Sequence, residues 1–109
     1  DQGSGDGVLR LGDLELNPSS HEVNRGGEEI NLTVRELELL QHLLEHSGQV
    51  RKRQEILESV WGPTFVGDDN LLDVYVRYLR RKLEPAGKPT LIQTVRGVGF
   101  MAKEGALKA

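Results

Sequence analysis

The apolar residues of this chain change their spacing twice, and the order of the three patterns limits the folds that it can adopt. Residues 8–32 alternate short apolar stretches with turn residues, as small antiparallel strands do. Residues 33–83 repeat apolar residues at helical spacing, and residues 91–102 return to alternation around a Gly-rich turn. The order of sheet, three helices and hairpin predicts an α+β winged helix-turn-helix fold whose terminal β-hairpin is the wing.

The three helical runs have recognisable ends. Thr33 followed by Glu36 is a capping-box pattern, in which each side chain bonds a backbone N–H of the first turn. This run continues to Gly48, which suits the left-handed stop of a helix. A second run covers about residues 52–61, and a third covers about residues 70–83. The meander before them is expected to hold three or four strands.

Length and composition bound the class of protein. A chain of 109 residues with 37% apolar and 28% charged residues has the size and balance of one globular domain. The absence of cysteine excludes disulfide scaffolds, cysteine-ligated zinc and thiol catalysis, and suits a reducing cytoplasm. No stretch is long and apolar enough to span a bilayer, so no membrane partner is expected.

Charge is divided unevenly between the two ends of the chain. Residues 1–47 carry ten acidic and three basic side chains, whereas residues 77–109 carry two acidic and eight basic ones. A positive surface can therefore form although the net charge is −3. The polar, Gly-rich residues 1–7 are expected to be a linker remnant, residues 8–104 the domain, and residues 105–109 a tail.

The third helical run divides its side chains between two faces. At about 100° per residue, Leu72, Val76, Leu79 and Leu83 form a narrow apolar stripe that is expected to be buried. The opposite face and its flanks carry Asn70, Val74, Tyr75, Arg77, Tyr78, Arg80 and Arg81. Guanidinium and hydroxyl groups bind phosphates or base edges, and a small apolar group contacts the thymine methyl, so this face suits a DNA major groove.

Two further features bear on DNA. Arg96 precedes the tight turn of the hairpin and would project from a narrow tip, a geometry that suits a minor groove. With Asp69 or Asn70 as its cap, the third helix could also present backbone N–H groups to a phosphate. The simpler alternatives are that residues 80–82 form a solvated cationic helix end, and that Arg96 caps its turn or pairs with a carboxylate.

Five separated blocks of this sequence resemble the effector domain of OmpR/PhoB-type response regulators. They are residues 32–37 (LTVREL), 48–50 (GQV), 60–62 (VWG), 72–83 (LDVYVRYLRRKL) and 92–100 (IQTVRGVGF). Their order and spacing make the resemblance specific, and it covers residues 8–103. It implies a four-stranded antiparallel sheet, three helices and a wing, with the third helix in the major groove and the wing in the adjacent minor groove.

The resemblance also implies roles for individual residues. Those facing bases would be Leu71, Val74 and Tyr78. Those lying along sugar and phosphate would be Asn70, Tyr75, Arg77 and Arg80, with support from Trp61 and Thr94. The minor-groove reader would be Arg96. Two departures matter: Asn70 and Tyr78 stand where some members have arginine, and Lys52 replaces the usual serine cap, which costs about 1 kcal/mol of capping.

The partners implied by the resemblance are those of a two-component output domain. They are double-stranded DNA with direct-repeat sites, a second copy bound in tandem, an N-terminal receiver domain and a cognate histidine kinase. The loop 62–69 corresponds to a segment that some members use to touch RNA polymerase. A bacterial cytoplasmic location is implied, with nucleoid association when the domain is bound. No cofactor is expected.

Two other functions are weighed against DNA binding. An enzyme or metal site would have to use His42 and His46, which share a helix face but lack a third ligand on it, so neither is expected. The Gly97–Gly99 turn lacks the third glycine and the strand-to-helix setting of a nucleotide loop. The remaining alternative is a winged-helix protein-interaction module without DNA binding.

Overall fold

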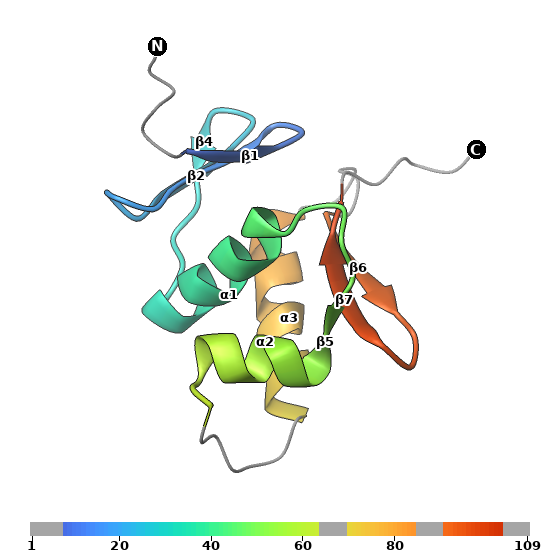
Figure 1. Ribbon diagram of the computed structural model, residues 1–109. Helices are drawn as coiled ribbons and strands as arrows, with labels where there is room; N and C mark the ends of the chain where they lie inside the picture. The colour runs from blue at the N-terminus through green and yellow to red at the C-terminus, as the bar shows by residue number, and fades with distance from the viewer. Residues whose placement is uncertain (1–7, 64–69, 85–90, 104–109) are drawn as a thin grey trace, which may run out of the picture.

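The computed structural model describes residues 8–63, 70–84 and 91–103 of the chain. The elements in chain order are β1 (Leu9–Leu11), β2 (Leu14–Asn17), β3 (Glu22–Arg25), β4 (Glu28–Glu29), α1 (Val34–Glu45), β5 (Arg51–Lys52), α2 (Arg53–Val60), α3 (Asn70–Leu83), β6 (Ile92–Val95) and β7 (Gly99–Ala102). A four-stranded sheet lies on one side of the three helices and a hairpin lies on another (Figure 1). The predicted α+β winged-helix architecture is confirmed.

The N-terminal sheet is an antiparallel meander with strand order β1-β2-β3-β4. Leu16 lies opposite Val23 in the β2–β3 register, and both are buried, whereas Glu15 beside Leu16 is exposed. This alternation places one face of the sheet on the core and leaves the other to solvent. The sheet packs next to α1, at the opposite end of the molecule from α2 (Figure 1).

Helix α1 begins with the predicted capping box. The Thr33 hydroxyl accepts a hydrogen bond from the Glu36 N–H at 3.3 Å, and the Glu36 carboxylate accepts one from the Thr33 N–H at 3.0 Å. The same carboxylate, only 3% exposed, pairs with the Lys82 ammonium at 2.7 Å. Burial by itself would raise the pKa of Glu36, but the Lys82 ammonium and the Thr33 N–H outweigh it and hold that pKa below its ordinary value.

Helix α2 has only half of a capping box. Lys52 occupies the N-cap position, and its ammonium has no lone pair with which to accept a hydrogen bond. The Glu55 carboxylate reaches back to the Lys52 N–H at 3.0 Å, so one end of the box is still satisfied. The expected lack of a side-chain cap is confirmed. The helix is also shorter than predicted, because residue 52 belongs to a strand.

That strand, β5, is the element which the sequence prediction missed. Its two residues pair with β7, so that β5, β7 and β6 form a three-stranded sheet rather than an isolated hairpin. The pairing requires Gly99, since a Cβ atom there would lie 1.9 Å from the carbonyl oxygen of Arg51. The wing is therefore joined at its base to the segment that leads directly into α2.

The three helices enclose one core. The stripe predicted for α3 is confirmed, because Leu72, Val76, Leu79 and Leu83 are all buried. They join buried leucines of α1, Ile56 of α2 and residues of both sheets in a single cluster. Within the part of the chain that the structure describes, none of the helices combines the length and apolarity needed to cross a bilayer.

Candidate nucleic-acid interface

Helix α3 presents a polar face opposite its buried stripe. Of the residues predicted to contact DNA, six are exposed, namely Asn70, Arg77, Tyr78, Arg81, Thr94 and Arg96. Five are half-buried, namely Trp61, Leu71, Val74, Tyr75 and Arg80. The N-terminal half of α3 and the turn of the wing lie at the same end of the molecule, away from the N-terminal sheet (Figure 1). The predicted site residues therefore lie on α3, on the wing and directly after α2, and their contact with DNA stays a prediction.

Three aromatic rings line one flank of this face. Trp61 meets Tyr75 edge to face with ring centroids 5.2 Å apart, and the Tyr75 and Tyr78 centroids are 6.0 Å apart. The Arg35 guanidinium lies over the Trp61 ring at 5.4 Å, a cation–π distance. Trp61 and Tyr75 are packed against the core, whereas Tyr78 is 42% exposed. The inner two rings thus hold Tyr78 at the surface.

Arg80 connects α3 to the wing. Its Nε and one terminal nitrogen donate to the Ile92 carbonyl oxygen at 3.1 and 2.8 Å, and the same terminal nitrogen donates to the Thr94 hydroxyl at 2.7 Å. Both acceptors belong to β6. The side chain predicted to lie along phosphate is therefore already bonded to the wing, and the Thr94 hydroxyl shares that contact.

An ion pair between Arg53 and Asp73 holds the N-terminal end of α3. Arg53, the first residue of α2, donates two hydrogen bonds to the Asp73 carboxylate, at 2.9 and 2.8 Å. Its backbone N–H also donates to the Val98 carbonyl oxygen at 3.3 Å, and its guanidinium lies 5.6 Å from the centre of the Phe100 ring. The Arg53 hydrogen bonds, followed by the charges of Arg53 and Arg77, lower the pKa of Asp73 in spite of its partial burial.

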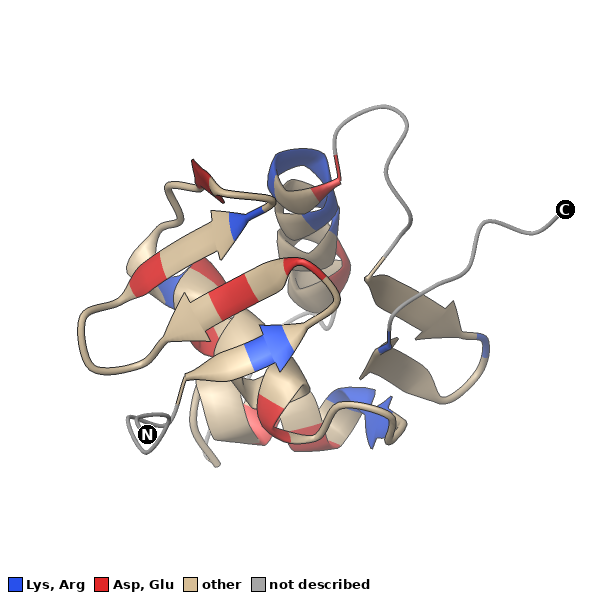
Figure 2. Ribbon diagram, turned by 90° about the horizontal axis from the view of Figure 1, so that it is seen from above, with Lys and Arg blue, Asp and Glu red and all other residues tan. Residues whose placement is uncertain are grey.

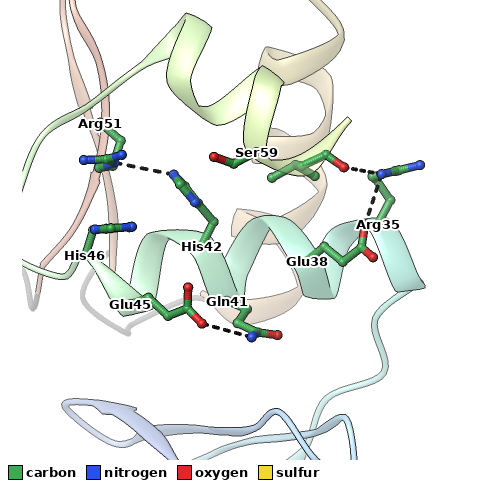
Figure 3. A pocket seen from close by; sticks show the side chains of 9 residues that line it. Arg35, Glu38, Gln41, His42, Glu45, His46, Arg51 and Ser59 are labelled. Atoms are coloured by element: carbon green, nitrogen blue, oxygen red, sulfur yellow. Dashed lines mark hydrogen bonds and ion pairs between the residues drawn. The ribbon is translucent and has the colours of Figure 1, made fainter. Parts of the chain in front are cut away.

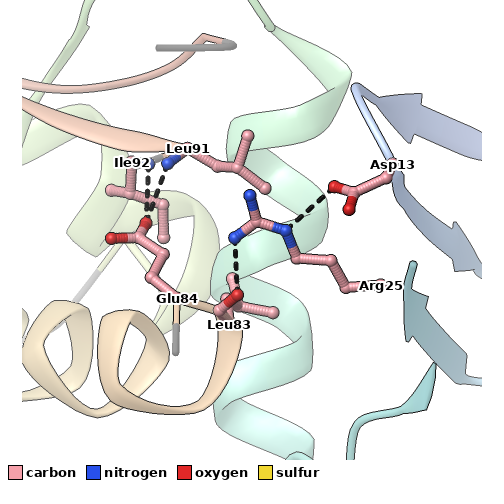
Figure 4. Close-up of polar contacts among 6 residues, drawn as sticks. All are labelled: Asp13, Arg25, Leu83, Glu84, Leu91 and Ile92. Carbon is pink, nitrogen blue, oxygen red and sulfur yellow. Dashed lines mark hydrogen bonds and ion pairs between the residues drawn. The ribbon is translucent and has the colours of Figure 1, made fainter. Parts of the chain in front are cut away.

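The C-terminal end of α3 is held by a buried arginine and a half-buried glutamate (Figure 4). Arg25 of β3, 4% exposed, donates to the Leu83 carbonyl oxygen at 2.6 Å and to the Asp13 carboxylate at 2.9 Å. Glu84 follows the helix and accepts hydrogen bonds from the N–H groups of Leu91 and Ile92, at 2.8 and 3.3 Å. The last turn of α3 is therefore tied both to the N-terminal sheet and to the first wing strand.

The tip of the wing offers one cation and one apolar group. Arg96 is exposed, and within the described parts of the chain its guanidinium makes no hydrogen bond or ion pair. Val98 beside it is 41% exposed. The turn is closed by a hydrogen bond of 3.0 Å from the Val98 N–H to the Val95 carbonyl oxygen, and Gly97 adopts the φ of +77° that it requires.

The C-terminal turns of α3 and the turn of the wing are basic. Figure 2 shows basic residues at both places, whereas the strands of the N-terminal sheet carry acidic residues together with the basic Arg10 and Arg25. The alternative of a solvated cationic helix end applies to only one of residues 80–82. Arg80 bonds the wing and Lys82 pairs with Glu36, while Arg81 is exposed.

A groove of about 590 Å³ lies between α1 and α2 rather than beside the polar face of α3 (Figure 3). Its polar groups bind one another: the Arg51 guanidinium donates to His42 Nε2 at 3.4 Å, and Gln41 donates to Glu45 at 3.0 Å. The rings of His42 and His46 are 4.9 Å apart. Among the described residues, no three His, Cys, Asp or Glu side chains are grouped so that they could hold a metal ion.

Four features of the sequence prediction lie outside the described residues. They are Asp69, the suggested cap of α3; residues 64–69 of the loop assigned to RNA polymerase contact; the linker remnant 1–7; and the tail 105–109. Conversely, the contacts of Arg53, Asp73 and Glu84 were not predicted. Arg53 and Asp73 stand 20 residues apart and belong to different helices, so no local spacing pattern relates them.

The fold and this surface define a winged-helix class of DNA-binding domain, and comparison with known proteins identifies the family. The family model described as "Transcriptional regulatory protein, C terminal" matches residues 27–102. The chain is 50% identical over 97 residues to response regulator MprA of Mycobacterium tuberculosis, and 47% identical over 95 residues to the uncharacterized transcriptional regulatory protein YkoG of Bacillus subtilis. It therefore belongs to the output domains of OmpR/PhoB-type response regulators. This is a family of transcriptional regulators, not a class of enzymes.

These alignments cover 89% and 87% of this chain but 42% of each relative, so the chain spans less than half the length of the proteins that it matches. Solved structures of isolated domains match more completely. The DNA-binding domain of Klebsiella pneumoniae RstA in complex with the RstA box is 33% identical, with a TM-score of 0.79 and coverage of 89% of this chain and 97% of that one. The DNA-binding domain of CpxR from E. coli is 32% identical, with a TM-score of 0.78 and coverage of 91% and 98%.

Proposed function

We propose that this domain binds double-stranded DNA in a sequence-specific manner and controls transcription, without catalysing a reaction. The observation that carries the proposal is the placement of the N-terminal half of α3, with its exposed residues, and the turn of the wing at one end of the molecule. The RstA domain, which is similar over most of this chain, was solved in complex with its DNA box. An α-helix with its side chains fills the width of a major groove, so α3 is the element that would enter it.

The individual roles follow from exposure and chemistry. Val74 and Tyr78, together with Leu71, would read base edges, because they lie outside the buried stripe of α3 and carry no fixed charge. The exposed Arg77 and Arg81 would neutralise phosphates, with Asn70, Trp61 and Tyr75 beside them.

On the wing, Arg96 would enter the minor groove, where a narrow A/T-rich flank strengthens the attraction for a cation. Arg80 and Thr94 would act as a pair, since their side chains are already bonded to each other at 2.7 Å. A phosphate oxygen approaching them would meet a hydroxyl and a guanidinium that need no reordering.

The setting of the domain in a longer protein is part of the proposal. Residues 1–7 would be a linker from a phospho-accepting receiver domain that a histidine kinase controls, residues 8–104 the output domain, and residues 105–109 a tail. Two copies would bind direct repeats about one helical turn apart, and pairing would strengthen binding through effective concentration. The loop 62–69 would contact RNA polymerase. The protein would act in the cytoplasm, on the nucleoid.

Selection of bound duplexes from a randomised DNA pool, followed by affinity at two salt concentrations, tests the proposal. We expect a direct repeat to be enriched, with binding that weakens steeply as salt rises, because several phosphates are neutralised. No enrichment together with no binding at low salt would refute DNA recognition by this chain and favour a protein partner.

Two substitutions separate the roles within the surface. Arg77→Ala should weaken binding to all sequences alike and reduce the salt slope by about one phosphate. Arg96→Ala should weaken binding most where the flank is A/T-rich, whereas an equal loss on every flank would contradict minor-groove reading. Arg10→Ala, in an exposed ion pair of the N-terminal sheet, is the matched control and should leave the affinity unchanged.

A further inference from the structure

The Arg53–Asp73 pair places an acidic side chain within the surface that is proposed to bind a polyanion. Asp73 lies in the first turn of α3, one helical turn before Arg77, and its side chain is 42% exposed. A free carboxylate at this point would repel phosphate. It would also be able to pair with Arg77, because Asp and Arg four residues apart on a helix attract each other.

The structure gives that carboxylate another partner. The two hydrogen bonds from Arg53, at 2.9 and 2.8 Å, engage both carboxylate oxygens in a fork-to-fork arrangement, the strongest geometry for this pair. Arg77, by contrast, is exposed and makes no hydrogen bond or ion pair to any residue that the structure describes. The Asp73 carboxylate is thus bound to α2 rather than to its neighbour on α3.

Arg53 is well placed to keep this arrangement. Its backbone N–H donates to the Val98 carbonyl oxygen, and its guanidinium lies against the Phe100 ring of β7. The backbone hydrogen bond fixes the start of α2 against the wing turn, and the contact with Phe100 limits the rotamers that the Arg53 side chain can adopt, so less entropy is lost when it binds the carboxylate.

We propose that Arg53 is a positioning residue for DNA binding: by holding the Asp73 carboxylate it leaves the Arg77 guanidinium available to a DNA phosphate. The inference rests on the proposed DNA-binding function. Arg53 itself has no contact with DNA in this account. Its effect is exerted through Asp73 and reaches the phosphate through Arg77.

A double-mutant cycle tests this role. Arg53→Gln, Asp73→Asn and the double variant are compared with the wild-type chain on one duplex that carries the selected site, at salt concentrations from about 50 to 200 mM. We expect Arg53→Gln to weaken binding by roughly three- to tenfold and to reduce the salt slope by about one phosphate. The double variant should return to within about twofold of wild type, because its neutral amide no longer captures Arg77.

Unfolding by urea supplies the readout that separates this role from a structural one. Neither Arg53→Gln nor the double variant has the ion pair, so both should be less stable than wild type by a similar amount. A double variant that regains DNA affinity but not stability would therefore identify Arg53 as a positioning residue rather than a structural one. Arg10→Gln removes one cation from the distant sheet and controls for the change in net charge.

Two results would overturn the proposed role of Arg53, and a third would refute the DNA-binding function on which it rests. Wild-type affinity in Arg53→Gln would overturn it. A double variant that binds as weakly as Arg53→Gln would overturn it as well, and would indicate that Arg53 touches DNA itself or supports the surface mechanically. A wild-type chain that binds no duplex would instead refute the proposed function.

Discussion

The two ends of α3 are held by contacts of opposite character. At the C-terminal end, the Arg25 guanidinium is 4% exposed and binds a backbone carbonyl, and Glu84 binds two backbone N–H groups of the wing strand. At the N-terminal end, Arg53 and Asp73 are 30% and 42% exposed and bind each other. Loss of one partner costs most where the other stays buried, whereas exposed ion pairs contribute little to stability.

The difference suggests a division of tasks. The C-terminal contacts, buried at Arg25 and half-buried at Glu84, join the helix to the N-terminal sheet and to the wing, and they lie away from the proposed base-reading side chains. The exposed N-terminal contact lies among those side chains, where its charges act on the binding surface. Stability and DNA affinity should therefore respond differently to changes at the two ends.

Removing Arg25 should have the largest effect on stability. Arg25→Ala deprives the Leu83 carbonyl oxygen of a charged donor in a buried setting, which should lower the free energy of unfolding by about 2–3 kcal/mol. Urea denaturation measures the change. Arg10→Ala breaks an exposed pair in the same sheet, with side chains 58% and 52% exposed, and should change stability by less than about 0.5 kcal/mol. Equal effects of the two substitutions would contradict the comparison.

Removing Glu84 should have the next largest effect. Glu84→Ala leaves the N–H groups of Leu91 and Ile92 without their carboxylate acceptor, and both residues are buried. We expect a loss of about 1–2 kcal/mol in the free energy of unfolding, with much of it recovered in Glu84→Gln, whose amide oxygen still accepts. If both variants were as stable as wild type, the wing would not depend on this contact.

Acidic pH should lower the stability of the domain through protonation of His42 in α1. Burial, followed by the charges of His46 and Arg51, lowers the pKa of His42, while the charges of Glu45 and Glu55 act in the opposite direction. The folded chain therefore binds fewer protons here than the unfolded chain, so stability should fall as the pH drops below the ordinary histidine value of about 6.5.

The protonated ring would direct an N–H at the Arg51 guanidinium of β5, the strand that pairs with β7 and leads into Arg53. His42→Gln should flatten the stability profile between pH 7.5 and 5.5, while His21→Asn, a change in an exposed turn, should leave it as it is. The carboxylates with lowered pKa, Glu36, Glu55 and Asp73, affect stability only at lower pH, near and below 4.5. An unchanged slope in His42→Gln would exclude this histidine as the cause.

Removing the charge of Asp73 should have the smallest effect on stability. Asp73→Asn breaks an exposed pair, so the free energy of unfolding should change by less than about 1 kcal/mol. DNA should bind at least as tightly as to wild type, because a negative charge has left the surface. A large loss of stability would place this contact in the same class as that of Arg25.

Local patterns explain what could be predicted from the sequence. The capping box of α1 requires residues three apart, and the stripe of α3 requires apolar residues three and four apart, so both are visible along the chain. The wing is a hairpin between neighbouring segments. Residue spacing also separated the buried and exposed faces of α3 correctly, since burial on a helix follows its 3.6-residue period.

Long-range contacts explain what could not be predicted. Strand β5 has two residues, and its partner β7 lies more than 40 residues further along the chain, so neither length nor alternation marks it. The partners of Arg80 and Arg53 depend on how close α3 comes to the wing and to α2, which spacing does not reveal. For the same reason the sequence predicted which cations lie on α3, but not that Arg80 and Lys82 are already bonded.

Titration of the isotopically labelled chain with its selected duplex, followed by NMR, tests most directly whether α3 and the wing form one DNA-binding surface. We expect the largest amide shifts on the exposed positions of α3 and on residues 94–98 of the wing, with little change in strands β1–β4. Shifts concentrated in the N-terminal sheet, or along the groove between α1 and α2, would contradict this expectation.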